Sequence, residues 1–111
     1  MRLSTLPMRL AAGDGSDAFR RHWRTSALPG LRAFRPQLVV VSAGFDALRG
    51  DPLANIQLDA ADYRWLTHEL RDIAEASAQG RIVSTLEGGY GLTAIGPAVV
   101  AHLMALGDCA R

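Results

Sequence analysis

The sequence has little cysteine, little net charge and no long apolar run, and each scarcity excludes a class of protein. Cys109 is the single cysteine among 111 residues, so the chain cannot form an internal disulfide, and a reducing cytoplasm suits it best. No segment approaches the roughly 18–20 consecutive apolar residues of a membrane span. The first ten residues lack the apolar core and cleavage site of a secretory signal. We therefore expect a cytoplasmic protein that is not embedded in a membrane.

The charge balance gives no sign of a nucleic-acid partner. Twelve basic residues stand against eleven acidic ones, and the formal net charge is +1. A nucleic-acid-binding surface requires a concentrated basic patch, and here the basic residues are scattered. With 49% hydrophobic and 21% charged residues, the composition is that of an ordinary globular chain long enough for one small domain.

The spacing of apolar residues predicts an α/β chain with the order helix, strand, helix, strand, helix. Helices are predicted near 16–34, 59–79 and 92–106, and strands near 38–42 and 82–86. Residues 38–41 form a continuous apolar run, and residues 82–86 are rich in β-branched side chains; both segments are typical of parallel strands covered on both faces. A strand, a crossover helix and a second strand form a βαβ unit with parallel pairing.

Two strands are too few for a normal parallel sheet. We therefore expect more of the sheet to come from a missing N-terminal region or from an oligomer partner, and the chain alone to expose apolar sheet surface.

The apolar pattern also predicts which side of each helix faces inward. In the middle helix the stripe is Tyr63, Leu66, Leu70 and Ile73, with Asp62 on the polar side. Pro29 and Gly30 predict a kink near the end of the first helix. In the last helix we expect an inward face made of Leu92, Ile95, Val99, Leu103 and Leu106.

Two loops leave the carboxyl ends of the predicted strands, where ligands bind in open α/β sheets. Asp46 follows the first strand, and Tyr90 follows the second after Gly88 and Gly89. Because neighbouring strands lie about 4.8 Å apart, both side chains should face a common space. Each also has an ordinary structural explanation, since an aspartate after a strand often caps a turn and a tyrosine beside glycines can simply pack.

Taken together, the two loops resemble a known family. Residues 42–47 read Ser-Ala-Gly-Phe-Asp-Ala, residues 50–53 read Gly-Asp-Pro-Leu, and residues 86–90 read Leu-Glu-Gly-Gly-Tyr. These segments are similar to the zinc-ligand and catalytic-tyrosine segments of the histone deacetylase and acetylpolyamine amidohydrolase family, in its class II-like, bacterial form. The resemblance extends from about residue 8 to 106 and makes 1–111 a single partial domain, the C-terminal portion of a deacetylase domain.

The resemblance implies the arginase/deacetylase fold, a parallel sheet flanked by helices, and hydrolysis of acetyl-lysine or acetylpolyamine amides. Asp46 would be one of three Zn²⁺ ligands, and Tyr90 would donate its hydroxyl to the developing oxyanion. Gly88 and Gly89 would shape the tyrosine loop. Leu48 departs from the pattern, because the family often has histidine there.

The family's Asp-x-His segment and its catalytic histidine pair are missing from the chain. His22, His68 and His102 all fall within predicted helices, so we expect helix-surface or boundary positions and no ligand role. The chain alone should therefore hold zinc poorly and be inactive.

Two other readings remain open. One is a non-catalytic α/β remnant that serves as an interaction module. The other is a dinucleotide-binding βαβ piece, because residues 89–94 match G-x-G-x-x-A after a strand, although no acidic residue ends a further strand.

Overall fold

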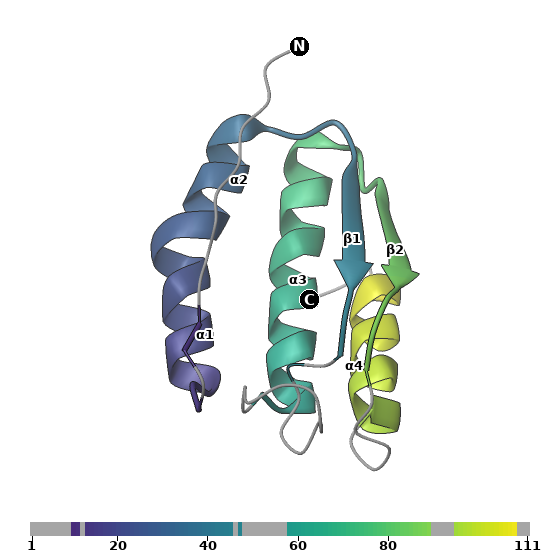
Figure 1. The fold of residues 1–111 in the computed structure, drawn as a ribbon. Helices are drawn as coiled ribbons and strands as arrows, with labels where there is room; N and C mark the ends of the chain where they lie inside the picture. The colour runs from purple at the N-terminus through teal and green to yellow at the C-terminus, as the bar shows by residue number, and fades with distance from the viewer. Residues whose placement is uncertain (1–9, 12, 46, 48–57, 90–94, 109–111) are drawn as a thin grey trace.

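The computed structural model describes residues 10–11, 13–45, 47, 58–89 and 95–108, and it has the predicted order of helices and strands (Figure 1). The boundaries agree closely with the predicted ranges, although β1 begins one residue later than predicted. None of the described helices is long and apolar enough to cross a membrane. In chain order the elements are α1 (Ser16–His22), the π-helical turn η1 (Trp23–Ala27), α2 (Leu28–Phe34), β1 (Val39–Ala43), α3 (Ala60–Ser77), β2 (Ile82–Leu86) and α4 (Ile95–Gly107).

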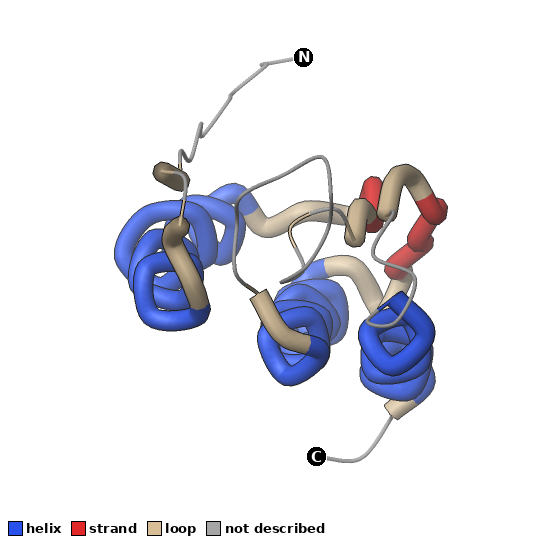
Figure 2. Tube along the Cα trace, turned by 60° about the horizontal axis from the view of Figure 1, so that its bottom comes forward, coloured by secondary structure: helices blue, strands red, loops and turns tan. Residues whose placement is uncertain are grey.

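The strands β1 and β2 pair in parallel, as predicted. Val39 stands opposite Ile82, and the register continues to Ala43 opposite Leu86. Helix α3 makes the crossover between them. Helices α3 and α4 lie on one side of the strands, and the α1–α2 segment packs beside α3 (Figure 2). The described chain is therefore one βαβ unit with helices on a single side of its sheet.

The irregularity in the first helical segment lies earlier than the predicted kink. Pro29 stands in the first turn of α2 and has no N–H to donate to a residue one turn earlier. The backbone widens into η1 immediately before it, and the axis continues as α2. Arg35 then ends the helix with a left-handed φ of 53°. The proline is thus accommodated by a π-helical turn that precedes it.

The core consists of two clusters between the sheet and the helices. Its buried residues are Ala43, Phe45 and Ala98 in one cluster, and Leu28, Leu70 and Ile73 in the other. Val41 on β1 packs against both clusters. The sheet and α3 therefore share one continuous apolar layer.

The predicted inward face of α4 was right in part. Ile95 and Val99 pack against a core cluster, as predicted. Leu103 is 58% exposed, whereas the buried residues of this helix are Ala98, His102 and Ala105. The small alanine side chains allow α4 to approach α3 closely, and the histidine finds polar partners there. Leu92 lies outside the described residues. Close packing and hydrogen bonding, rather than side-chain size, decided which face turned inward.

The predicted position of Asp62 on the polar side of α3 was also wrong, because this residue is 0% exposed. Its carboxylate accepts hydrogen bonds from Ser16 Oγ at 2.6 Å and from Arg20 Nε at 2.9 Å. A third comes from the Asp59 backbone N–H at 3.0 Å, within a capping box that starts α3. The α1 partners enclose the charge, so burial is compensated by charge-assisted hydrogen bonds.

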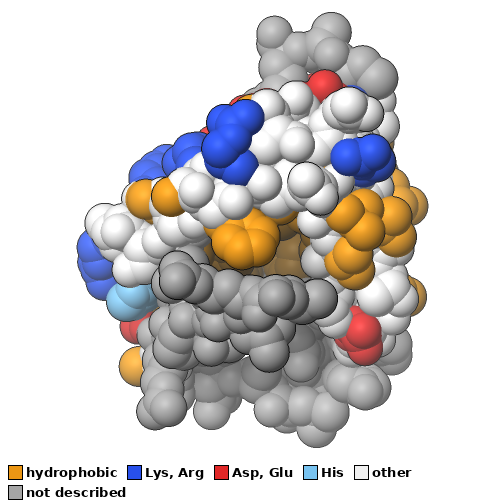
Figure 3. All heavy atoms as spheres, turned by 90° about the horizontal axis from the view of Figure 1, so that it is seen from above, with side chains coloured by type: hydrophobic (Ala, Val, Ile, Leu, Met, Phe, Trp, Pro, Cys, Tyr) orange, Lys and Arg blue, Asp and Glu red, His pale blue; other side chains and the backbone are white. Residues whose placement is uncertain are grey.

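One face of the sheet is open. Val40 and Val83, which are register partners, are 64% and 55% exposed, and Leu38 just before β1 is 52% exposed. Hydrophobic side chains also reach the surface at the end of the molecule that Figure 3 views from above. The described residues thus cover only one face of the strands, whereas the sequence predicted that both faces would be covered. The expectation of exposed apolar sheet surface is confirmed. We call Leu38, Val40, Ser42, Val83 and Thr85 the open sheet face.

Candidate active site

The two candidate loops leave adjacent strand ends and are joined by backbone hydrogen bonds. The Glu87 N–H donates to the Ala43 carbonyl at 3.0 Å, and the Phe45 N–H donates to the Gly88 carbonyl at 2.7 Å. The parallel ladder therefore continues past the last pair of the sheet and into both loops.

Two of the predicted site residues, Asp46 and Tyr90, lie outside the described residues, so their roles stay predictions. The other two, Gly88 and Gly89, are described and lie against the loop that follows β1. The structure therefore brings together the residues that immediately precede the predicted metal ligand and the predicted oxyanion donor.

Phe45 anchors the first loop in the helical layer. Its side chain is 1% exposed and stacks on Tyr63 of α3, with ring centroids 4.7 Å apart and planes inclined by 24°. Its edge-on contact with His102 of α4 has a centroid distance of 5.9 Å. The ring thus touches both helices that cover the sheet.

His102 is buried and links three elements, against the prediction of a helix-surface or boundary position. It is 5% exposed, and its ring nitrogens lie 2.7 Å from Thr67 Oγ1 of α3 and 2.7 Å from Ser84 Oγ of β2. Thr67 donates its own hydrogen to the Tyr63 carbonyl at 2.6 Å, so it must accept from His102 Nδ1–H. Nε2 then accepts from Ser84. Burial lowers the pKa of His102, which agrees with a neutral ring.

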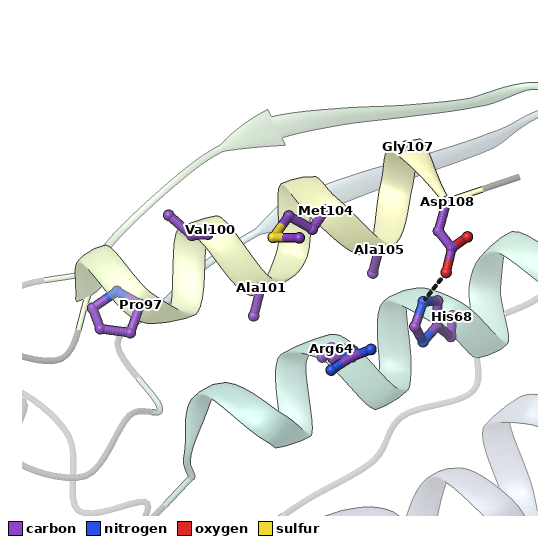
Figure 4. A pocket seen from close by; sticks show the side chains of 9 residues that line it. All are labelled: Arg64, His68, Pro97, Val100, Ala101, Met104, Ala105, Gly107 and Asp108. Carbon is purple, nitrogen blue, oxygen red and sulfur yellow. Dashed lines mark ion pairs between the residues drawn. The ribbon is translucent and has the colours of Figure 1, made fainter. Parts of the chain in front are cut away.

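The other histidines lie away from the strand ends. His68 Nε2 is 3.3 Å from an Asp108 carboxylate oxygen in an open groove of about 720 Å³ between α3 and α4 (Figure 4). Arg64 of α3 and apolar residues of α4, among them Val100 and Met104, also line this groove. His22 is half-buried at the end of α1. The groove is formed by helix side chains and not by the loops that follow the strands.

The described part of the chain does not fit a bound metal by itself. Within it, no three His, Cys, Asp or Glu side chains come together in a group that could hold a metal ion. A catalytic zinc ordinarily has three protein ligands. Asp46 is the one ligand that the sequence predicts, so further ligands would have to come from beyond the described residues.

Sequence reasoning missed the residues that support these loops. Phe45 was read only as part of a motif, and nothing in its spacing indicates that it stacks on Tyr63. The partners of His102 come from 35 and 18 residues away, so no local pattern predicts them. The available signal was His102 itself, a polar residue within the apolar sequence of α4. The prediction instead placed the larger Leu103 beside it on the inward face.

Comparison with known proteins places the chain in a family. Residues 2–106 match the family described as the histone deacetylase domain. A histone deacetylase-like amidohydrolase from Pseudomonas aeruginosa is 47% identical over 85 residues, which are 77% of this chain and 22% of that protein. Histone deacetylase 14, chloroplastic, from Arabidopsis thaliana is 37% identical over 103 residues, or 93% of this chain and 24% of that protein.

A solved structure shares the fold. The crystal structure of the HDA15 HD domain aligns with a TM-score of 0.78 at 34% identity, and the match covers 91% of this chain and 28% of that one. The chain thus spans about a quarter of the length of these relatives.

Proposed function

The chain belongs to the histone deacetylase family, and from that premise we propose that it supplies part of the active site of a zinc-dependent amidohydrolase acting on acetyl-lysine or acetylpolyamine amides. The observation that carries the proposal is the joining of the two strand-end loops through the Phe45 N–H and the Gly88 carbonyl, 2.7 Å apart. Active sites of open α/β sheets form where such loops meet.

In this proposal Asp46 and Tyr90 have different tasks. Asp46 is one of three zinc ligands, and Tyr90 donates its hydroxyl to the oxygen that gains negative charge during amide hydrolysis. An oxyanion donor of this kind contributes about 10²–10³ in rate. When bound, zinc polarises the amide carbonyl and activates water. Gly88 and Gly89 let the backbone that leads to Tyr90 pass close to the neighbouring loop.

We further propose that the domain is completed by the part of a deacetylase domain that this chain lacks, an N-terminal portion. Parallel sheets are normally covered on both faces, and here the described part of the chain leaves the open sheet face exposed. Two five-residue strands have a planar footprint of only about 160 Å² on that face, from a strand separation of about 4.8 Å and a rise of about 3.3 Å per residue. A stable self-association needs about 800 Å² per partner. A partner that covers the face and also pairs with the free strand edges fits better than a second copy.

The test uses this chain together with the missing portion of a deacetylase domain, with zinc content and deacetylation measured on the same samples. Asp46→Ala should abolish zinc binding. Tyr90→Phe should retain zinc but lower turnover by about 10²-fold or more, because only the oxyanion donor is lost. The exposed Asp17→Ala serves as the control and should change neither. Full turnover of the Tyr90→Phe protein would contradict the proposed role of this residue.

A further inference from the structure

Phe45 and Gly89 meet at the point where the two candidate loops leave the sheet. A Cβ atom built on Gly89 would lie 2.9 Å from Phe45 Cβ and 2.7 Å from Ile95 Cδ1. Real Cβ atoms essentially never approach that closely. Gly89 also has a φ of 149°, a conformation that side chains disfavour. Only glycine therefore allows this approach of the two loops.

The Phe45 side of the contact is rigid. The ring is buried, stacks on Tyr63 and meets the edge of His102, so α3 and α4 both hold it in place. His102 is itself held by hydrogen bonds to α3 and β2. Pressure on Phe45 from the second loop would therefore be resisted by packed helices.

The Gly89 side is held in two ways. Gly88, its neighbour, accepts the Phe45 N–H at 2.7 Å, and the side chain of Ile95 in the first turn of α4 packs against Gly89 from the other direction. The backbone that leads into the second loop thus lies between Phe45 and Ile95, with no room for a side chain.

Phe45 directly precedes Asp46, and Gly89 directly precedes Tyr90. Consecutive Cα atoms are about 3.8 Å apart, so the Phe45–Gly89 contact lies one residue from each predicted catalytic position. We propose that Phe45 is a positioning residue: its contact with Gly89 fixes the separation of the two loops at the residues that directly precede Asp46 and Tyr90. This inference rests on the proposed function for its catalytic meaning. A displacement of about 1 Å in an active site can lower the rate about 10²-fold.

The first experiment measures the separation itself in the full chain. Spin labels are attached at Asp46→Cys and Tyr90→Cys in a Cys109→Ser background, and the label-to-label distance distribution is recorded. Gly89→Ala should shift and broaden it, since a contact of 2.9 Å must open by 0.5 Å to reach the ordinary 3.4 Å. Gly96→Ala is the matched control, because a Cβ there meets nothing within 4 Å. It should leave the distribution unchanged.

Hydrogen exchange gives a second readout without labels. Gly89→Ala should make the Phe45 amide exchange about tenfold faster, as expected when one hydrogen bond is weakened. Amides in the middle of α3 should exchange at the rate seen in the Gly96→Ala control. Equal label distances and equal Phe45 exchange in the two variants would overturn the positioning role.

A second pair of variants keeps the proposal testable if Gly89→Ala prevents folding. Phe45→Leu removes the stacked ring, and Phe19→Leu removes a buried ring from α1, away from both loops. The first should broaden the label distances and the second should not; the same broadening in both would also overturn the role. Neither readout depends on zinc or turnover. Undiminished turnover in Tyr90→Phe would therefore contradict the proposed function but would not change the conclusions from the label distances and the hydrogen exchange.

Discussion

The buried polar side chains among the described residues are Asp62, Thr67 and His102, and each makes a specific hydrogen bond across elements. Asp62 joins α3 to α1, and the Thr67–His102–Ser84 chain joins α3, α4 and β2. A buried polar group without a hydrogen-bond partner destabilises the fold by roughly 1–3 kcal/mol. These residues therefore specify which helix surfaces meet.

Replacing Asp62 should destabilise the chain more than replacing any exposed acid. Asp62→Ala removes three hydrogen-bond acceptor contacts and leaves Arg20 and Ser16 without their partner. We expect the free energy of unfolding to fall by about 2–3 kcal/mol, measured by urea denaturation. Asp17→Ala, on the exposed side of α1, should change it by less than about 1 kcal/mol. A similar loss in both variants would contradict the role of the buried carboxylate.

The neutral state of His102 predicts a pH dependence of stability. Burial lowers its pKa in the folded chain below the ordinary value of 6.5. As the pH falls below 6.5, the unfolded chain binds a proton that the folded chain does not, so stability decreases until the folded pKa is reached. Above 6.5 this group contributes no slope.

The measurement compares urea midpoints between pH 5 and 8 in the parent chain and in His102→Gln. All other residues are the same in both proteins, so the difference between the two curves isolates His102. We expect the parent curve to fall more steeply below pH 6.5. Parallel curves would show that this ring is not held neutral.

At the level of elements, the two strands differ sharply between their faces. Val41 packs against both core clusters, whereas its neighbour Val40 is 64% exposed beside Val83. Side chains alternate along a strand, so one apolar run supplies both a core face and an uncovered face. Helices α3 and α4 pack on the core face, and the described residues do not cover the other face.

Threonine substitutions should separate the two faces. Val40→Thr with Val83→Thr keeps branched side chains on the open sheet face and should reduce concentration-dependent association without lowering the urea midpoint. Val41→Thr, the matched inward control, should lower the free energy of unfolding by about 1–2 kcal/mol, because it buries a hydroxyl. Analytical ultracentrifugation and denaturation would check both. Equal destabilisation by the two sets would mean that the open sheet face is covered after all.

At the scale of the whole molecule, the chain is similar to one part of a larger domain. It aligns with a deacetylase domain at a TM-score of 0.78 but covers only 28% of that chain. Its helices and its βαβ unit are internally packed, while the described residues leave one sheet face and the outer edges of both strands uncovered.

The chain by itself, supplied with zinc and an acetyl-lysine or acetylpolyamine substrate, should show no deacetylase turnover. The described residues offer no metal-binding group, and a single carboxylate at Asp46 should not hold a catalytic zinc. The loss of a general acid–base pair alone lowers rates by about 10²–10⁴-fold. Zinc content by elemental analysis, beside turnover, checks this. One zinc per chain with turnover that Tyr90→Phe abolishes would prove the chain a complete enzyme.

Local pattern was sufficient for the elements and their order. The β-branched residues specify β1 and β2, and the apolar stripe from Tyr63 to Ile73 specifies α3, because each pattern depends on residues close together in sequence. Parallel pairing followed from the strand–helix–strand order. The motifs around Asp46 and Tyr90 indicated the family, because active-site loops have specific sequences.

The tertiary structure alone decided which surfaces meet. The inward turn of His102 instead of Leu103, the burial of Asp62 and the wedge of Phe45 against Gly89 depend on partners from other elements. Hydrophobic periodicity predicts the buried face of a helix from its average polarity. A close contact between helices is instead stabilised by small side chains and by polar atoms that find hydrogen-bond partners, and those partners come from residues distant in sequence. The sequence predicted exposed apolar sheet surface, but the tertiary structure decided which face is open, because α3 and α4 both pack on the other side of the strands.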